Sequence, residues 1–292
     1  MADNSDFSPL GHLLFPQRSQ PTMPAAAILA ELFKIETAPP PLPPFVPVTP
    51  SQPNVAISRR RITASLSQAA DGDITDGRVL PSLDAIPIAN GRKLKAAILY
   101  NDLKGFSGLV AGLPKKKTLS ILHAFVSEMA RIASEFGGEV VDCAGDRIMA
   151  VFWRPHNNND RQPIYDAICC GFWMQTVTDR AFRSVLIQKR LPSVSCGIGI
   201  DYGEVIATRV GIRNRNKLVL LGSAANIAAK LEDVAAEGQT VVSPVVYNHR
   251  PSFMSVEGGW LFQPHPSWHA PAYYMSNTVF KNDNTRREYV RR

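Results

Sequence analysis

The chain has 292 residues, of which 45% are hydrophobic and 20% are charged, a mixture typical of a globular protein with one or two domains. Its formal net charge is +7. Residues 1–90 carry 6 basic and 8 acidic side chains, whereas residues 91–292 carry 26 and 17. The positive second part favours an anionic partner such as a nucleotide, a nucleic acid or an acidic lipid.

Several classes of protein are excluded by composition. No run of about 18 apolar residues exists to span a membrane, and the four cysteines form no CxxC pair and no zinc-type cluster with histidine. The N-terminal residues are acidic, which argues against a secretory signal. We therefore expect a cytoplasmic protein with free thiols and no membrane span.

Residues 1–90 differ from the rest of the chain. Eight prolines lie between Pro39 and Pro53, and proline favours extended backbone without hydrogen-bond donors. Upstream, Ala25–Glu36 has the composition of one short helix. We predict a flexible, proline-rich N-terminal arm over 1–90, with a docking or regulatory arm as the alternative.

The pattern changes after Lys95, where alternating and helical periodicities begin. In chain order, the sequence predicts a buried strand at AAILYND, a helix over Thr118–Phe136, a hairpin of Glu139–Asp142 and Arg147–Trp153, a helix over Ile164–Asp179, a strand pair Val194–Asp201 and Glu204–Val210 turning at Tyr202-Gly203, a strand Lys217–Leu221, a helix that Ser223 caps and that runs to about Ala236, and a strand Thr240–Ser243. This order indicates an α+β, ferredoxin-like domain over 91–280, an antiparallel-rich sheet covered by helices. A basic tail follows at 281–292.

Two aspartates are candidates for a metal site. Asp102 ends the first strand and Asp146 lies in the hairpin turn AGDR. A hairpin paired beside the first strand would bring both carboxylates to one edge of the sheet, where they suit a divalent ion with bound phosphate. Between them, Gly105–Gly108 forms a glycine-containing turn whose amides could hold a polyphosphate. Taken singly, each aspartate is better explained as a turn residue.

Asn226 and Lys230 form a second candidate pair. They are four residues apart on a helix and project from one face. An amide and a cation there suit a charged phosphoryl group, although a lone lysine on a helix is usually only solvated.

Four segments together resemble the signature blocks of class III nucleotidyl cyclases. They are LYNDLKGFSGL, VVDCAGDRIMAVF, GIGIDYGEVIATRVG and LLGSAANIAAKLE, which lie within about 94–244 in the expected order. The resemblance implies an enzyme that converts a nucleoside triphosphate to a 3′,5′-cyclic monophosphate and pyrophosphate. It also implies a head-to-tail homodimer with sites at the interface and two divalent ions, Mg²⁺ or Mn²⁺, in each site.

The resemblance also assigns roles to residues. Asp102 and Asp146 match the metal-binding pair, completed by the backbone of Leu103. The amides of Phe106 and Ser107 would contact the terminal phosphates, and Arg215 is a further basic residue for phosphate. Asn226 matches the residue that orients the ribose. Lys230 stands where the family usually has a transition-state arginine, so that a point charge replaces a bidentate group.

The positions that read the base match no common purine pattern. They are Asp142 and Val219, where adenylate cyclases usually have lysine with aspartate or threonine, and guanylate cyclases glutamate with cysteine. Asp142 has no donor for adenine N1, but it suits the N3–H of uracil. Tyr100 replaces a common phenylalanine and adds bulk to the pocket, unless it is simply a core tyrosine.

This combination is similar to the bacterial Pycsar cyclases, which make cyclic UMP or cyclic CMP as an anti-phage signal for a separate effector protein. We therefore expect UTP as the substrate and cyclic UMP as the product, with cyclic CMP or cyclic AMP as alternatives. A catalytically degenerate nucleotide-binding domain is the alternative of another class. A ferredoxin-like RNA-binding module would need aromatic residues in an RNP-like pattern, so we expect no nucleic-acid partner.

Overall fold

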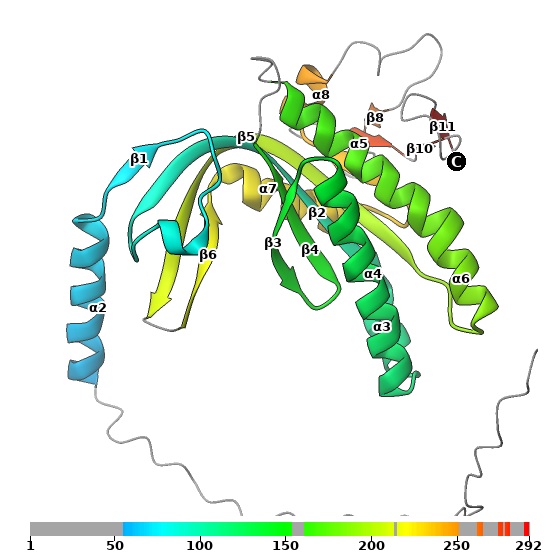
Figure 1. Ribbon diagram of the computed structural model, residues 1–292, viewed down its shortest axis with the longest axis horizontal. Helices are drawn as coiled ribbons and strands as arrows, with labels where there is room; N and C mark the ends of the chain where they lie inside the picture. Colours follow the sequence, from blue (N-terminus) through cyan, green and yellow to red (C-terminus); the bar gives the residue numbers. More distant parts are fainter. Residues whose placement is uncertain are drawn as a thin grey trace, which may run out of the picture. The chain divides into compact units, whose positions relative to one another are not determined.

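Two long antiparallel strands, β2 (Gly91–Lys104) and β5 (Ser195–Ile212), form the centre of the sheet in the computed structural model (Figure 1). They pair without interruption from Gly91–Thr208 to Lys104–Ser195. The run of small and aliphatic residues in the middle of β2 is buried because helices cover both faces. The structure describes residues 55–153, 161–212, 215–250, 262–264, 274–276, 278–280 and 289–291.

The other strands extend this central pair on both sides. The described sheet has the order β3-β4-β2-β5-β7-β9-β8, and β6 pairs with the second half of β5. Its further strands are β3 (Glu139–Ala144), β4 (Arg147–Phe152), β6 (Arg215–Leu221), β7 (Thr240–Val242), β8 (Gln263–Pro264) and β9 (Tyr274–Ser276). Most neighbouring strands of this sheet are antiparallel, whereas β7 is parallel to β5. The α+β domain with an antiparallel-rich sheet, expected from the sequence, is therefore confirmed.

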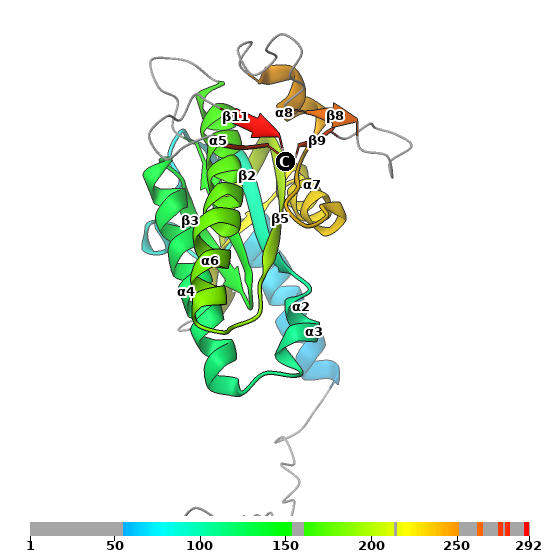
Figure 2. The same ribbon diagram turned by 90° about the vertical axis from the view of Figure 1, so that its right-hand side faces the viewer.

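Helices α4 (Lys115–Glu135) and α5 (Gln162–Val177) cover one face of the sheet (Figures 1 and 2). Their apolar residues, among them Phe125 and Phe172, pack with Ala97 and Leu99 of β2 in one core cluster. Helix α5 continues through a π turn, η2 (Thr178–Phe182), into α6 (Arg183–Gln188). The helix expected to end at Asp179 is therefore longer.

The opposite face carries α7 (Ser223–Val234), a shorter helix. Ala224 and Ala228 of α7 pack against Ala96 and Ile98 of β2. Successive residues of a strand alternate between faces, so Tyr100 and Asp102 share the α7 face with Ala96 and Ile98. After β7, Ser243 caps α8 (Pro244–His249) by accepting a hydrogen bond from Val246 N.

Two local expectations were wrong. Tyr202 and Gly203 do not form a turn but continue β5, because Gly203 pairs with Ala96 within the long β2–β5 ladder. Ser223 is the first residue of α7 rather than its cap, which is Gly222. Gly222 lies close to β5, and a Cβ there would be 2.7 Å from Glu204 O. This close approach of two segments of the backbone requires glycine at this position.

Regular structure begins before residue 90, within the arm expected to be flexible. Helix α2 (Val55–Ala70) is followed by β1 (Ile74–Asp76), the short helix η1 (Leu83–Ala85) and then β2. Strand β1 pairs in parallel with the start of β2, and Leu80 and Ile86 are buried in the α7-side core. Burial of these apolar side chains explains why residues 74–90 join the domain.

The remaining predictions for the chain ends concern residues outside those that the structure describes. This applies to the proline-rich stretch, to the helix expected over Ala25–Glu36 and to most of the basic tail. Strands β10 (Thr278–Phe280) and β11 (Tyr289–Arg291) form a separate antiparallel pair. Within the described parts of the chain, no helix has both the length and the apolar character needed to cross a membrane.

Candidate active site

The C-terminal end of β2 and the β3–β4 turn bring two carboxylates to the same edge of the sheet. Asp102 pairs in register with Gly197 of β5, while Asn101 beside it pairs with Ile148 of β4. Asp146 precedes β4 by one residue, in a turn made possible by the left-handed Gly145 (φ 65°). The strand pairing thus brings Asp102 and Asp146 to one edge of the sheet, close enough for their charges to interact, although 44 positions separate them in sequence.

The electrostatics of Asp102 reflect this proximity. Partial burial, followed by the negative charges of Asp146 and Glu232, raises the pKa of Asp102 from 3.8 to about 6, against the opposing effect of Arg147 and Lys104. Two neighbouring carboxylates that repel each other are stabilised by a cation between them. The donor set therefore fits a divalent ion.

Protein ligands at this edge are few. Within the described residues, no group of three or more His, Cys, Asp or Glu side chains could hold a metal ion. Magnesium commonly takes only one or two carboxylates and completes its shell with water and substrate phosphate. A pair of aspartates supplemented by the carbonyl of Leu103 suits this preference, and a closed structural metal site does not fit.

The chain reverses direction directly after this edge. Gly105 adopts a left-handed conformation (φ 72°) and is the N-cap of α3 (Phe106–Val110). This agrees with the glycine-containing turn that we predicted here. Phe106 is buried and anchors the turn, whereas Ser107 is exposed. The first amides of a helix have no partner within it, so those of Phe106 and Ser107 are available near the carboxylates.

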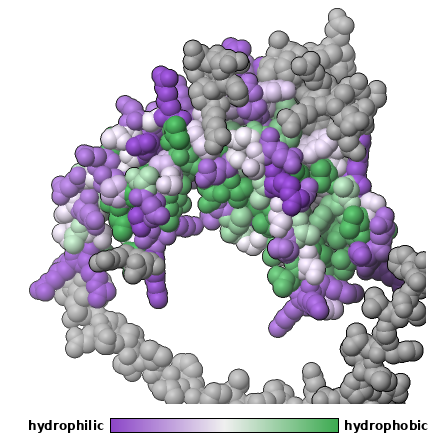
Figure 3. Space-filling model, viewed as in Figure 1, coloured by the Kyte–Doolittle hydropathy of each residue, from purple (hydrophilic) through white to green (hydrophobic). Residues whose placement is uncertain are grey.

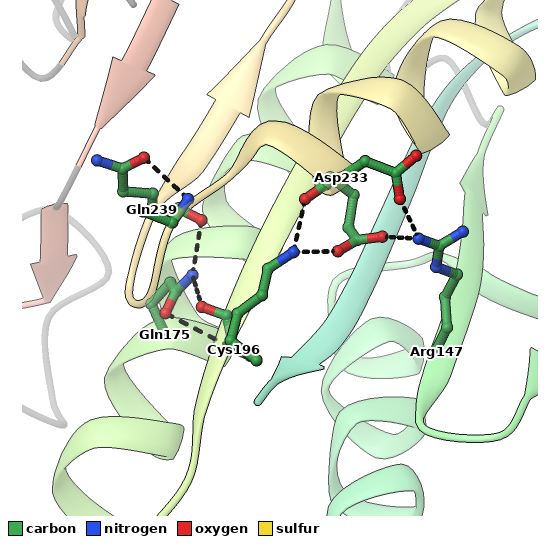
Figure 4. Close-up of polar contacts among 8 residues, drawn as sticks. Arg147, Gln175, Cys196, Asp233 and Gln239 are labelled. Carbon is green, nitrogen blue, oxygen red and sulfur yellow. Dashed lines mark hydrogen bonds and ion pairs between the residues drawn. The ribbon is translucent and has the colours of Figure 1, made fainter. Parts of the chain in front are cut away.

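An ion network around the buried Glu232, which we did not predict from the sequence, connects this edge to α7 (Figure 4). The ammonium of Lys104 donates to Glu232 Oε1 at 2.6 Å and to the carbonyl of Glu232 at 2.8 Å. Arg147 pairs with Glu232 Oε2 and also donates to Asp233 Oδ1 at 2.5 Å. The Glu232 side chain is 0% exposed. No sequence signal marked Glu232, because charged residues near a helix end are usually solvated.

A second unpredicted contact lies among the residues matched to base recognition. Lys217 of β6 donates to Asp142 Oδ2 of β3 at 3.2 Å. Val219 lies two residues further along β6 and therefore on the same side of that strand as Lys217. The two-residue spacing between Lys217 and Val219 could therefore have identified Lys217 from the sequence as a neighbour of the base-recognition positions.

Tyr100 borders the same region. The guanidinium carbon of Arg147 lies 5.8 Å from the centre of the Tyr100 ring. Burial raises the pKa of Tyr100, Arg147 lowers it and Asp142 raises it further, which places Tyr100 near both charges. Arg215, the first residue of β6, is exposed.

Asn226 and Lys230 lie one turn apart on α7 and are exposed, whereas Ala228 and Glu232 are buried. The helix therefore turns the asparagine and the lysine away from its own sheet. Figure 3 shows this face of the domain hollowed between the part that holds β6 and the part that holds α3 and α4, with apolar residues along both sides. This exposure leaves Asn226 and Lys230 accessible to a second molecule.

A mixed sheet with two carboxylates at one edge, followed by a left-handed glycine and a short helix, is the arrangement that the resemblance to nucleotidyl cyclases implies. Residues 88–257 match the family model of the adenylate and guanylate cyclase catalytic domain. The chain belongs to this family and is a class III nucleotidyl cyclase.

Relatives in sequence include a uridylate cyclase from Rhodovulum sp. (strain MB263), 30% identical over 187 residues that cover 61% of this chain and 75% of the relative. A uridylate cyclase from Burkholderia cepacia is 31% identical over 168 residues, covering 54% of this chain and 68% of the relative. An adenylate cyclase from Anabaena cylindrica is 26% identical, and the match covers 53% of this chain and 30% of that protein.

Solved structures share the fold. The guanylyl cyclase Cya2 superposes with a TM-score of 0.55 at 24% identity, covering 64% of this chain and 92% of that one. The adenylyl cyclase CyaB from P. aeruginosa gives a TM-score of 0.56 at 19% identity, covering 67% and 98%. Both similarities establish the cyclase fold expected from the sequence.

Proposed function

We propose that this cyclase converts UTP to cyclic UMP and pyrophosphate at sites shared between two head-to-tail subunits. Two uridylate cyclases are among its relatives at 30% and 31% identity. The observation that carries the choice of base is the ion pair between Asp142 and Lys217. It puts an acceptor and a donor side by side where the family resemblance locates the base.

The pair is complementary to one edge of uracil. The carboxylate of Asp142 accepts the N3–H, and the ammonium of Lys217 donates to a neighbouring carbonyl oxygen of the ring. Cytosine has no proton on N3, so a carboxylate facing that atom would be repelled. The neighbouring Tyr100 and Val219 narrow the space around the ring, which favours a single-ring base over a purine.

In the proposed mechanism, Asp102, Asp146 and the Leu103 carbonyl would hold two divalent ions, Mg²⁺ or Mn²⁺. When bound, these ions would lower the pKa of the ribose 3′-hydroxyl and neutralise charge on the triphosphate. The 3′-oxygen forms a bond to the α-phosphorus as the bond to the bridging oxygen of pyrophosphate breaks, and the hydroxyl proton passes to solvent. The amides of Phe106 and Ser107 bind the terminal phosphates. Arg215 pairs with Ile212 at the opposite end of β5 from Gly197, the partner of Asp102, so the same subunit does not bring Arg215 to these amides.

Asn226 and Lys230 complete the site from the second subunit. Asn226 orients the ribose, and Lys230 donates to the α-phosphoryl oxygens, where negative charge develops as the bonds change. Their exposure on α7 supports this role, because neither side chain is committed to the core of its own subunit. The cyclic nucleotide then acts as an anti-phage signal sensed by a separate effector protein.

Product analysis tests the proposal. The full-length protein is incubated with Mn²⁺ and each of ATP, GTP, CTP and UTP, and products are identified by mass spectrometry. We expect cyclic UMP as the main product. Cyclic AMP or cyclic CMP as the main product would overturn the choice of base, and no cyclic product from any nucleotide would favour a degenerate nucleotide-binding domain.

A further inference from the structure

The carboxylate of Glu232 has no role in the proposed reaction, yet it is completely buried. Removing a carboxylate from water is costly unless paired cations compensate for the lost hydration. Here, Lys104 pairs with one carboxylate oxygen and Arg147 with the other. Lys104 hydrogen-bonds to Oε1, whereas the contact of Arg147 with Oε2 is an ion pair without a hydrogen bond. Cations from two separate segments of the chain therefore hold the carboxylate in position.

These two segments are the ones that carry the candidate metal ligands. Lys104 follows Asp102 by two residues on β2, and Arg147 follows Asp146 directly. Glu232 itself follows Lys230 by two residues on α7. One buried side chain thus connects the carboxylate edge of a subunit to the helix that presents Asn226 and Lys230.

The surrounding backbone leaves room for this connection. A Cβ on Gly197 would lie 2.1 Å from Lys104 Cε, so glycine at this position allows the lysine side chain to pass along β5 towards α7. A Cβ on Gly199 would lie 2.2 Å from both Ala228 O and Glu232 N. The two glycines of β5 therefore let α7 approach the sheet closely enough for Glu232 to reach both cations.

We propose that Glu232 is a positioning residue that couples the two active sites of the dimer. In each subunit, Glu232 fixes the carboxylate edge, which belongs to one site, against helix α7, which the same subunit contributes to the other site. This inference rests on the head-to-tail dimer of the proposed function. Binding of metal and triphosphate at one edge would then hold α7 in place for catalysis in the other site.

A mixed dimer separates the two roles of Glu232. One chain carries Asp102→Ala and the other Lys230→Ala, so that only one site retains both carboxylates and an intact α7 face. Glu232→Gln is then introduced into either chain. In the Asp102→Ala chain it disturbs only the helix contributed to the intact site, and in the Lys230→Ala chain it disturbs only the carboxylate edge of that site.

We expect each placement to lower kcat in the intact site by about tenfold to a hundredfold, the usual range for residues that position metal ligands, with less than about a threefold change in the KM for UTP. If either placement leaves kcat within about twofold, the coupling is wrong. If the mixed dimer without Glu232→Gln is inactive although the wild-type protein is active, the head-to-tail site of the proposed function fails instead.

A measurement without nucleotide gives a second readout. Mn²⁺ binding to the homodimer, followed by electron paramagnetic resonance, should weaken about tenfold in Glu232→Gln and recover in Glu232→Asp, which keeps the charge. Lys104→Gln, which leaves the Arg147 pair intact, tests the same coupling if Glu232→Gln does not fold. Glu128→Gln removes an exposed ion pair with Arg131 on α4 and is the matched control. Unchanged Mn²⁺ binding in both Glu232→Gln and Lys104→Gln would overturn the proposal.

Discussion

The ammonium of Lys217 lies 3.2 Å from the carboxylate of Asp142 and connects β6 to β3. Both side chains remain partly exposed, at 68% and 47%, so each has free hydrogen-bonding capacity. Between surface residues such a pair contributes little to stability. The Asp142–Lys217 pair lies near Tyr100, so we test its role in recognition of the base rather than in stability.

Replacing Lys217 should therefore affect the nucleotide more than the fold. We expect Lys217→Met to lower kcat/KM for UTP by about tenfold, the equivalent of about 1.4 kcal/mol for a lost charged hydrogen bond. The melting temperature should stay within about 2 °C, because an exposed pair is removed. Lys115→Met on α4 is the matched control. An equal loss in both variants would show that Lys217 has no specific contact with the base.

Asp146→Asn should abolish turnover while preserving the fold. The amide keeps the size of the side chain but removes the charge that a divalent ion requires, so we expect a loss of about three orders of magnitude or more in kcat. Circular dichroism and isothermal titration with Mn²⁺ would separate lost binding from lost structure. The corresponding change at an exposed aspartate, Asp76→Asn, should leave both unchanged. Full activity in Asp146→Asn would exclude this residue as a ligand.

The pKa of Asp102 predicts a pH dependence of stability in the metal-free protein. Its value of about 6 exceeds the ordinary 3.8, so the folded state binds the proton more tightly than the unfolded chain does. The resulting stabilisation is complete below about pH 4 and is lost as pH rises through about 6. Above that pH, the ionised Asp102 destabilises the metal-free fold.

Asp102→Asn removes this ionisation. In EDTA, the variant should melt at a higher temperature than the wild-type protein at pH 7.5, and the difference should shrink towards pH 4. Differential scanning fluorimetry across that range provides the measurement. A variant that melts lower than the wild type at pH 7.5 would contradict the assigned direction. Added Mn²⁺ should raise the melting temperature of the wild type far more than that of the variant.

Gly199→Ala tests the close packing of α7 on β5. The new methyl group would lie 2.2 Å from backbone atoms of Ala228 and Glu232, which cannot rotate away as a side chain could. We expect a loss of about 2–4 kcal/mol in the free energy of unfolding, measured with urea. At Gly112 an added Cβ meets nothing nearer than 4.0 Å, so Gly112→Ala should change the stability by less than about 1 kcal/mol. Similar effects in the two variants would contradict the packing argument.

The class of fold and the local identity of most elements could be predicted from the amino-acid sequence alone. Periodicity of two in AAILYND and of three to four in Thr118–Phe136 reflects which side chains meet the core, and this information is local. The glycine-containing turn after Asp102 was equally visible, since left-handed backbone at Gly105 favours glycine. Local patterns failed at Tyr202-Gly203, where a turn-like dipeptide continues a strand because β2 supplies partners along its whole length.

The contacts between distant charged residues, in contrast, are a property of the folded chain. The Lys104–Glu232–Arg147 network and the Asp142–Lys217 pair join residues separated by 75 or more positions, and no periodicity encodes such contacts. Burial of Glu232 is a property of how closely α7 packs on Gly197 and Gly199, not of its own flanking residues. For the same reason, the shift in the pKa of Asp102 follows from neighbours that converge only when the sheet forms.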